Sequence, residues 1–138
     1  MPFLFWDASA VVPLLLPERK SPLAQDIWEE SQHVFAWDWL SVEVDAALTR
    51  RRGDPDAWRT WSHVESRFDF AGFENHDLDF LRSINRGLGL RAADAGHVYF
   101  FEKLSVRFSD LLMVTFDREM ADAVEALGLP LHMACTQS

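Results

Sequence analysis

Hydrophobic and polar residues follow one another along the chain in blocks that fit strands and helices in turn. Apolar runs of strand length occupy 3–6, 34–37 and 111–116, and 129–133 is predicted to form a last strand. Between these runs, apolar residues recur at the spacing of a helix, and polar residues, glycine or proline bound the segments. Strands that alternate with helices in this way predict an α/β fold with a mainly parallel central sheet.

Capping and turn residues set the predicted helix limits. Ser9 is expected to cap a helix that begins near Ala10 and that Pro17 ends, and Asn75 is expected to cap a later one. Gly53 and Gly128 mark two helix ends. The further predicted helices cover 21–31, 41–52, a segment that begins at 54–55, 75–86, 92–104 and 121–127.

The length and composition bound the class of protein. The chain has 138 residues, of which 49% are apolar and 25% charged, so we expect one soluble globular domain spanning 1–138. No apolar run is long enough to span a membrane, and the apolar start meets Asp7 too early for a signal peptide. The single cysteine, Cys135, cannot form an internal disulfide or a zinc cluster, which favours a reducing cytoplasm.

The charge of the chain restricts its possible partners. Its net charge is −9, from 22 acidic and 13 basic residues. That balance argues against broad, nonspecific affinity for nucleic acids. Divalent metal ions held by some of the acidic residues would offset part of this charge.

Four acidic residues fall where strands end or helices are expected to begin. Asp7 directly follows the first strand and Asp117 follows the 111–116 run, whereas Glu43 and Asp94 are predicted in first turns of helices. These positions face one rim of an α/β sheet, so the four carboxylates could converge there. Clustered carboxylates repel one another unless a hard cation such as Mg²⁺ or Mn²⁺ binds between them. The structural alternative is that each acid only caps a helix or complements its dipole.

The segments around these acids resemble, in order and spacing, the four acidic motifs of PIN domains. Asp7 lies in an Asp-x-Ser-Ala turn after the first strand, and Asp117 lies in a Thr-x-Asp segment. A turn into the last predicted strand also resembles that family, so the resemblance covers nearly the whole chain. The segments are FWDASAVV at 5–12, SVEVDAAL at 41–48, GLRAADAGH at 89–97, VTFDREM at 114–120 and EALGLP at 125–130.

Among PIN domains, the chain most resembles the VapC-type toxins of bacterial toxin–antitoxin pairs. That resemblance implies a PIN-like three-layer sandwich and a metal-dependent endoribonuclease that uses Mg²⁺, with Mn²⁺ as the other candidate. It further implies an RNA substrate, a cognate antitoxin protein and a homodimer. Two hydroxyl residues would support the acidic quartet by hydrogen bonds. The quartet is Asp7, Glu43, Asp94 and Asp117, and the supporting residues are Ser9 and Thr115.

Two residues depart from the usual motifs, and one neighbour of the quartet carries possible chemistry. Leu40 stands where many relatives have a hydroxyl residue, and Gly96 is unusually small for its helix, which suggests close packing against another backbone. His97 shares a helix face with Asp94 and could touch substrate, although a structural role is the interpretation we favour. Asp38 and Glu119 are secondary candidates for the same rim.

Basic and aromatic residues give weaker signals. Arg50 and Arg51 close one predicted helix, and Arg91 precedes Asp94, so each could contact RNA phosphates or simply complement a helix dipole. A stripe of Trp58, Trp61, Val64 and Phe68 at helical spacing predicts core packing. With six tryptophans in the chain, we also hypothesise that Trp28, Trp58 or Trp61 lines a surface for an antitoxin.

Two functions from other classes stay open on the sequence. A catalytically silent PIN fold would act only as a binding module, and absence of metal binding would favour it. A receiver-like phosphoacceptor domain is also acidic and α/β, but it needs a lysine near a late strand end. Lys103 instead falls within a predicted helix.

Overall fold

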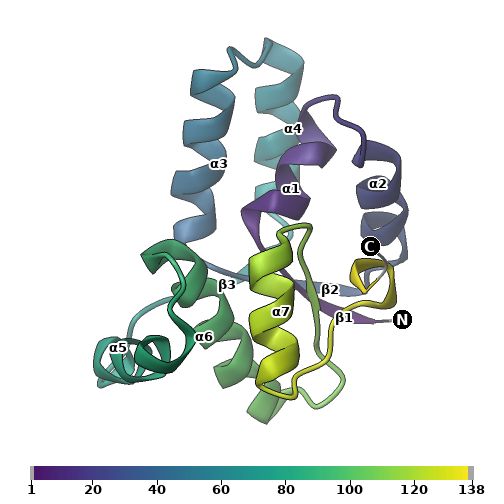
Figure 1. Cartoon of the computed structure of the whole chain (residues 1–138). Coiled ribbons are helices and arrows are strands. Elements are labelled where there is room, and N and C mark those ends of the chain that lie inside the picture. Colours follow the sequence, from purple (N-terminus) through teal and green to yellow (C-terminus); the bar gives the residue numbers. More distant parts are fainter. Residues whose placement is uncertain (1, 137–138) are drawn as a thin grey trace.

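Four parallel strands form the centre of the molecule in a computed structural model that describes residues 2–136 (Figure 1). Their spatial order is β3-β2-β1-β4, so the first strand lies inside the sheet and β3 and β4 form its edges. The strands are β1 (Phe3–Trp6), β2 (His33–Trp37), β3 (Phe68–Ala71) and β4 (Leu112–Val114). The helices are α1 (Ala8–Leu15), α2 (Ser21–Glu30), α3 (Trp39–Arg50), α4 (Pro55–Glu65), α5 (Asp77–Leu88), α6 (Ala92–Arg107) and α7 (Arg118–Ala126), followed by the short 3-10 helix η1 (Met133–Cys135).

The two faces of the sheet bury separate hydrophobic clusters. Leu4 and Trp6 of β1 pack into a cluster with α1 to α4, whereas Phe5, between them, packs into a second cluster with α5 to α7. Side chains along a strand alternate between the faces, so these apolar strands are buried on both sides. Figure 1 shows α1 to α4 above the sheet and α5 to α7 below it. The predicted three-layer α/β sandwich with a parallel sheet is therefore confirmed.

One strand was not predicted, and one predicted strand does not form. The segment 68–71 is the edge strand β3, so the assignment of Phe68 to a helix face was wrong. Two aromatic residues alternate there with an aspartate and a small residue, which is too short a pattern to identify a strand beside a strong helical one. The segment 129–133 makes only an isolated bridge between Leu131 and Met113 before η1 begins.

Several helix limits differ from the predictions. Asp7, not Ser9, takes the N-cap position of α1, and Asp117 caps α7 three residues earlier than predicted. His76, not Asn75, takes the N-cap position of α5. Helix α3 begins at Trp39, so Glu43 lies beyond its first turn and that prediction was wrong.

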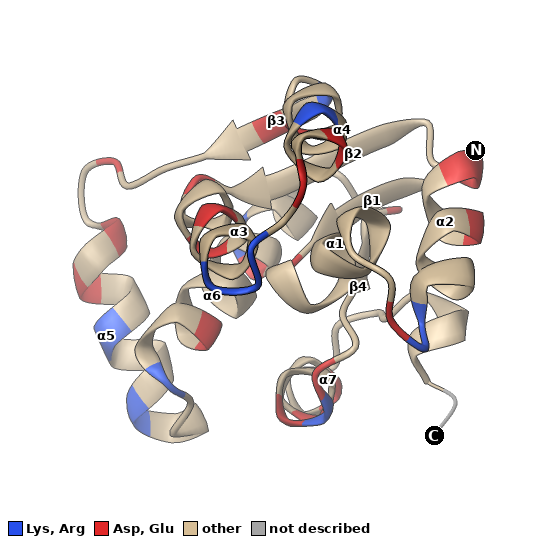
Figure 2. Cartoon of the chain, turned by 90° about the horizontal axis from the view of Figure 1, so that it is seen from above, with Lys and Arg blue, Asp and Glu red and all other residues tan. Residues whose placement is uncertain are grey.

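Acidic and basic segments are mixed over the helices (Figure 2). The basic run 50–52 ends α3 and enters the turn to α4. Within residues 2–136, no helix is both long and apolar enough to cross a membrane.

Candidate functional site

The first and last strands of the chain are neighbours, which brings Asp7 beside the segment that leads to Asp117. Trp6 pairs with Val114 in parallel register, and the Asp7 N–H donates to the Val114 carbonyl at 3.3 Å. Both strands end at this rim, where a parallel α/β sheet commonly places its ligands. These two strand ends therefore meet the condition under which both carboxylates can reach one crevice.

A network of hydroxyl groups ties the ends of β1 and β4 together. The Ser9 hydroxyl donates to Asp7 Oδ1 at 2.8 Å, and it accepts from the Phe116 N–H at 2.8 Å. It also lies 3.2 Å from the Thr115 hydroxyl, which accepts from the Asp117 N–H at 3.1 Å. Ser9 and Thr115 therefore occupy supporting positions between two of the predicted acids, and they orient the Asp7 carboxylate.

Asp7 is buried, and its charge has little compensation. Its side chain is 3% exposed and makes no helix-capping hydrogen bond, although the residue sits at the N-cap position. Burial raises the pKa of Asp7 to about 6, against the lowering influence of His97 and of the Ser9 and Thr115 hydroxyls. Helix capping therefore does not explain this residue.

The capping interpretation does hold for Asp117. One of its carboxylate oxygens, Oδ1, accepts from the Met120 N–H at 3.2 Å and caps α7. The second oxygen remains available for another role. Asp117 is thus both a structural cap and a carboxylate at the rim.

Glu43 and Asp94 reach the same region from two helices on opposite faces of the sheet. Glu43, on α3, contacts the His97 Nε2 through Oε1, and Asp94 lies in the first turn of α6. Burial raises the pKa of Asp94, and the negative charges of Asp117 and Glu43 raise it further, whereas His97 and Arg91 lower it. Glu43 also raises the pKa of Asp7. Among the four predicted acids, Glu43 therefore acts electrostatically on Asp7 and Asp94, and Asp117 acts on Asp94.

These residues fit a hard divalent cation by their chemistry. Carboxylate oxygens are the ligands that Mg²⁺ and Mn²⁺ prefer, and the pKa values of Asp7 and Asp94 stay raised although His97 acts on both and Arg91 on Asp94, so their negative charge is only partly compensated. Among residues 2–136, however, no three Asp, Glu, His or Cys side chains gather closely enough to hold an ion as they stand. Binding would require the carboxylates to draw together around the ion.

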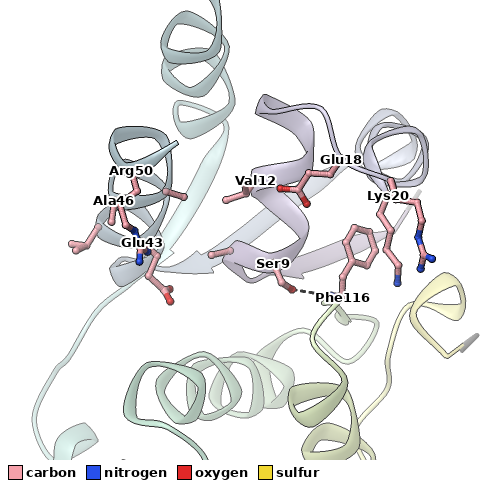
Figure 3. A pocket seen from close by; sticks show the side chains of 12 residues that line it. Ser9, Val12, Glu18, Lys20, Glu43, Ala46, Arg50 and Phe116 are labelled. Atoms are coloured by element: carbon pink, nitrogen blue, oxygen red, sulfur yellow. Dashed lines mark hydrogen bonds between the residues drawn. The ribbon is translucent and has the colours of Figure 1, made fainter. Parts of the chain in front are cut away.

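A cavity of about 710 Å³ opens beside the acids between α1 and α3 (Figure 3). Ser9 and Glu43 line it together with the aromatic ring of Phe116. The basic residues Arg19, Lys20 and Arg50 also line it, and the Lys20 ammonium lies 4.9 Å from the centre of the Phe116 ring. The cavity thus brings acidic, aromatic and basic side chains together in one place.

The structure separates the three arginines that were candidates for RNA contact. Arg50 lines the cavity, whereas Arg51 is ion-paired with Glu18. Arg91 sits at the N-cap position of α6, close enough to Asp94 to lower its pKa. Their contacts with RNA stay predictions, but the positions of Arg50 and Arg91 suit them better than that of Arg51.

The other candidate acids lie apart from these interactions. Asp45, two residues after Glu43 on α3, accepts a hydrogen bond from the Trp61 indole at 2.9 Å and so turns away from Glu43. Asp38 and Glu119 are exposed, and neither appears among the groups that shift the pKa of Asp7 or Asp94.

The tryptophans divide between the core and the surface. Trp28 and Trp61 are buried, at 8% and 3% exposure, whereas Trp58 is 37% exposed. Of the three tryptophans proposed for a partner surface, Trp58 is the one that such a partner could reach without rearrangement.

The contacts that His97 and Lys20 make at the site were not predicted from the sequence. His97, for which a structural role was favoured, contacts Glu43 directly. Its position three residues after Asp94 indicated that the two residues share a helix face. That spacing could not show that Glu43 of α3 lies within contact distance of His97. Lys20 carried no motif signal, because its approach to Phe116 depends on the turn between α1 and α2.

Comparison with known proteins identifies the fold. No protein-family model and no curated protein sequence matches the chain. The structure of Mycobacterium tuberculosis VapC20, a toxin that cleaves the sarcin-ricin loop, matches with a TM-score of 0.65 and 16% identity, over 87% of this chain and 94% of VapC20. Pyrobaculum aerophilum PAE2754 matches with a TM-score of 0.58 and 24% identity, over 91% of this chain and 93% of that one. The PIN-like fold predicted from the motifs is confirmed.

Proposed function

We propose that this PIN-like domain is a Mg²⁺- or Mn²⁺-dependent endoribonuclease and the toxin of a toxin–antitoxin pair. One observation carries the proposal: Asp7 is buried at the sheet rim with a raised pKa, and Glu43 raises the pKa of both Asp7 and Asp94, while Asp117 raises that of Asp94 further. A merely structural carboxylate at that depth would be expected to have enough cationic and hydrogen-bonding partners to keep its pKa from rising. The shared fold with VapC20 supports the substrate class, since VapC20 cleaves an RNA loop.

In this proposal Asp7, Glu43, Asp94 and Asp117 hold the divalent cation beside the scissile phosphodiester. Such a cation would supply positive charge to the phosphate and the departing oxygen, and would make nearby water more acidic. Asp7 is oriented by the Ser9 hydroxyl, and the Thr115 hydroxyl holds the backbone of Asp117. These fixed hydrogen bonds would reduce the reorganisation that the carboxylates undergo when they close on an ion.

The cavity between α1 and α3 offers a route for the RNA strand. Arg50 and Lys20 would pair with phosphates on either side of the site, and Phe116 would offer an aromatic face to a base. Local cationic groups of this kind would offset the net charge of −9 where the substrate lies. A cognate antitoxin and a homodimer, in a cytoplasmic setting, belong to the same proposal.

Cleavage assays with two carboxamide variants test the proposal. Asp7→Asn and Asp94→Asn should each lower kcat/KM on RNA by at least about 100-fold in Mg²⁺ or Mn²⁺, because each removes a charged ligand without removing a side chain. Glu119→Gln, a change of equal charge at an exposed position, is the matched control and should retain activity. Folded Asp7→Asn protein with full activity would refute the mechanism.

A second candidate function, that of a binding module without catalysis, is retained because the acidic side chains of the site do not already form a metal-binding cluster. The absence of a preformed three-ligand cluster among residues 2–136 favours a catalytically silent PIN fold that acts only by binding. Calorimetric titration of the purified protein with Mn²⁺ separates the two functions. Heat of binding that Asp94→Asn abolishes supports the nuclease, whereas no binding in the wild-type protein supports the silent module.

A further inference from the structure

The unusual glycine in the third motif makes room for a tryptophan rather than for another backbone. A Cβ atom built on Gly96 would lie 2.3 Å from a ring carbon of Trp37, closer than any real contact. The Trp37 indole, at the end of β2, thus lies directly against α6 where a side chain would otherwise stand. The sequence-based suggestion of close packing is confirmed, but its partner is a side chain.

That indole forms one wall around His97, the next residue of α6. The two rings meet edge to face with their centres 5.2 Å apart, and His97 is only 1% exposed. Its Nδ1 atom is buried and has no hydrogen-bond partner within the described part of the chain, residues 2–136. An unpartnered buried polar atom costs about 1–3 kcal/mol, so an aliphatic residue would suit this position better if packing were its only role.

The other nitrogen of His97 makes the interaction that offsets this cost. Nε2 contacts Oε1 of Glu43, which reaches across from α3 on the opposite face of the sheet. In Figure 3 the Glu43 carboxylate extends from α3 toward the end of the cavity where Ser9 lies. The contact occupies Oε1 and leaves Oε2 as the oxygen available to a ligand. It also joins the two helical layers at the site.

We propose that His97, fixed in place by Trp37 and Gly96, is a positioning residue that holds Glu43 in the orientation that binds the divalent cation. This inference rests on the proposed metal-dependent function and deepens it. Without His97, Glu43 would be an ordinary rotatable side chain on α3, and closing it onto an ion would cost conformational entropy. Groups that orient a metal ligand in this way commonly change metal affinity by about 10–100-fold.

Binding of Mn²⁺ alone to the full-length protein, followed by electron paramagnetic resonance at constant pH, tests this role. His97→Leu removes the nitrogen but keeps an apolar side chain, whereas His97→Gln retains an N–H donor near the position of Nε2. We expect the Kd for Mn²⁺ to rise at least about 10-fold in His97→Leu and to stay within about 3-fold of wild type in His97→Gln. Equal Mn²⁺ affinity in folded His97→Leu and wild-type protein would overturn the proposal.

Two further measurements keep the test decisive. If His97→Leu does not fold, ¹⁵N NMR of the histidine side chains in metal-free wild-type and Glu43→Gln proteins replaces it. A shift of the His97 Nε2 resonance is expected, and no shift would overturn the proposed contact. If wild-type protein itself binds no Mn²⁺, the proposed nuclease function fails as well. If wild-type binding is intact and insensitive to His97, only the positioning role fails.

Discussion

Two buried aspartates in this molecule have similar exposure and opposite electrostatics. Asp7, at the sheet rim, is 3% exposed, and Asp77, at the start of α5, is 5% exposed. Burial raises the pKa of Asp7 to about 6. Burial acts on Asp77 in the same direction, but hydrogen bonds from Lys103, Tyr99 and the Glu74 N–H outweigh it and lower the pKa of Asp77.

The partners of the two carboxylates account for this difference. Lys103 binds Asp77 at 2.8 and 2.9 Å, and the Tyr99 hydroxyl binds it at 2.6 Å, so its charge is fully compensated between α5 and α6. At Asp7 the charge of His97 and the Ser9 and Thr115 hydroxyls lower the pKa without outweighing burial, and Glu43 raises it further. Asp77 therefore has the pattern of a stabilising residue, whereas the pattern at Asp7 is one that stability alone does not favour.

Removal of Asp77 should have the largest effect on stability. Asp77→Ala leaves the Tyr99 hydroxyl and the Glu74 N–H without their acceptor and removes the partner of Lys103. We expect the free energy of unfolding to fall by about 3 kcal/mol in urea titrations, below the full range for a buried pair because Lys103 is 42% exposed. RNA cleavage by the folded variant should be unchanged. A loss below about 1 kcal/mol would contradict the structural role.

The corresponding change at Asp7 should stabilise the metal-free protein. Asp7→Asn removes a buried charge and retains an acceptor for Ser9, so we expect unfolding to cost about 2 kcal/mol more at pH 7.5. The interval between the ordinary pKa of 3.8 and about 6 sets an upper bound of about 3 kcal/mol. A stabilised variant that no longer cleaves RNA would show that Asp7 serves activity at the expense of stability.

The pH dependence of that gain has a definite sign. Because the folded pKa of Asp7 exceeds its unfolded value, the folded protein keeps this proton to higher pH, and its ionisation destabilises the fold. The destabilisation is absent below 3.8, grows as the pH rises toward about 6, and is complete above it. The gain in Asp7→Asn should therefore vanish near the lower end of this interval. An equal gain at both ends would exclude ionisation as its cause.

Addition of Mg²⁺ should change the stability of the Asp7 and Asp77 variants differently, by less than the substitutions themselves do. At a free Mg²⁺ concentration about ten times Kd, the wild-type protein should gain about 1.4 kcal/mol of stability. Asp77→Ala should show the same gain, because Asp77 is paired with Lys103 and is not one of the proposed cation ligands. Asp7→Asn should show almost none. Thermal unfolding with and without Mg²⁺ measures these differences, and an equal gain in Asp7→Asn would remove Asp7 from the cation site.

The smallest expected effects concern the arginines beside the cavity. Arg50→Ala should raise KM for RNA about 3- to 10-fold and reduce the dependence of binding on salt concentration, because it removes one phosphate contact. Arg51 is already paired with Glu18, so Arg51→Ala should change KM less than about 2-fold. Equal effects of the two substitutions would contradict the assignment of the cavity as the RNA path.

The sequence predicted the layers of the fold well because apolar strands buried on both faces leave a strong local pattern. Phe3–Trp6 and His33–Trp37 are such strands. The edge strand Phe68–Ala71 escaped prediction because half-exposed edge residues carry little of that pattern, and its pairing with β2 is a long-range contact. The start of α3 was predicted at Ser41, two residues too late, although Trp39 and Leu40 also suit a helix.

For the candidate site, the sequence by itself determined which residues to consider, because Asp7, Glu43, Asp94 and Asp117 lie in four local motifs that resemble, in order, those of PIN domains. Only the tertiary structure decided how they differ. Asp117 caps a helix, Asp7 is buried with a raised pKa, and Glu43 contacts His97 across the sheet. Burial and charge compensation depend on what distant segments bring to a side chain, and no spacing along the chain encodes that directly.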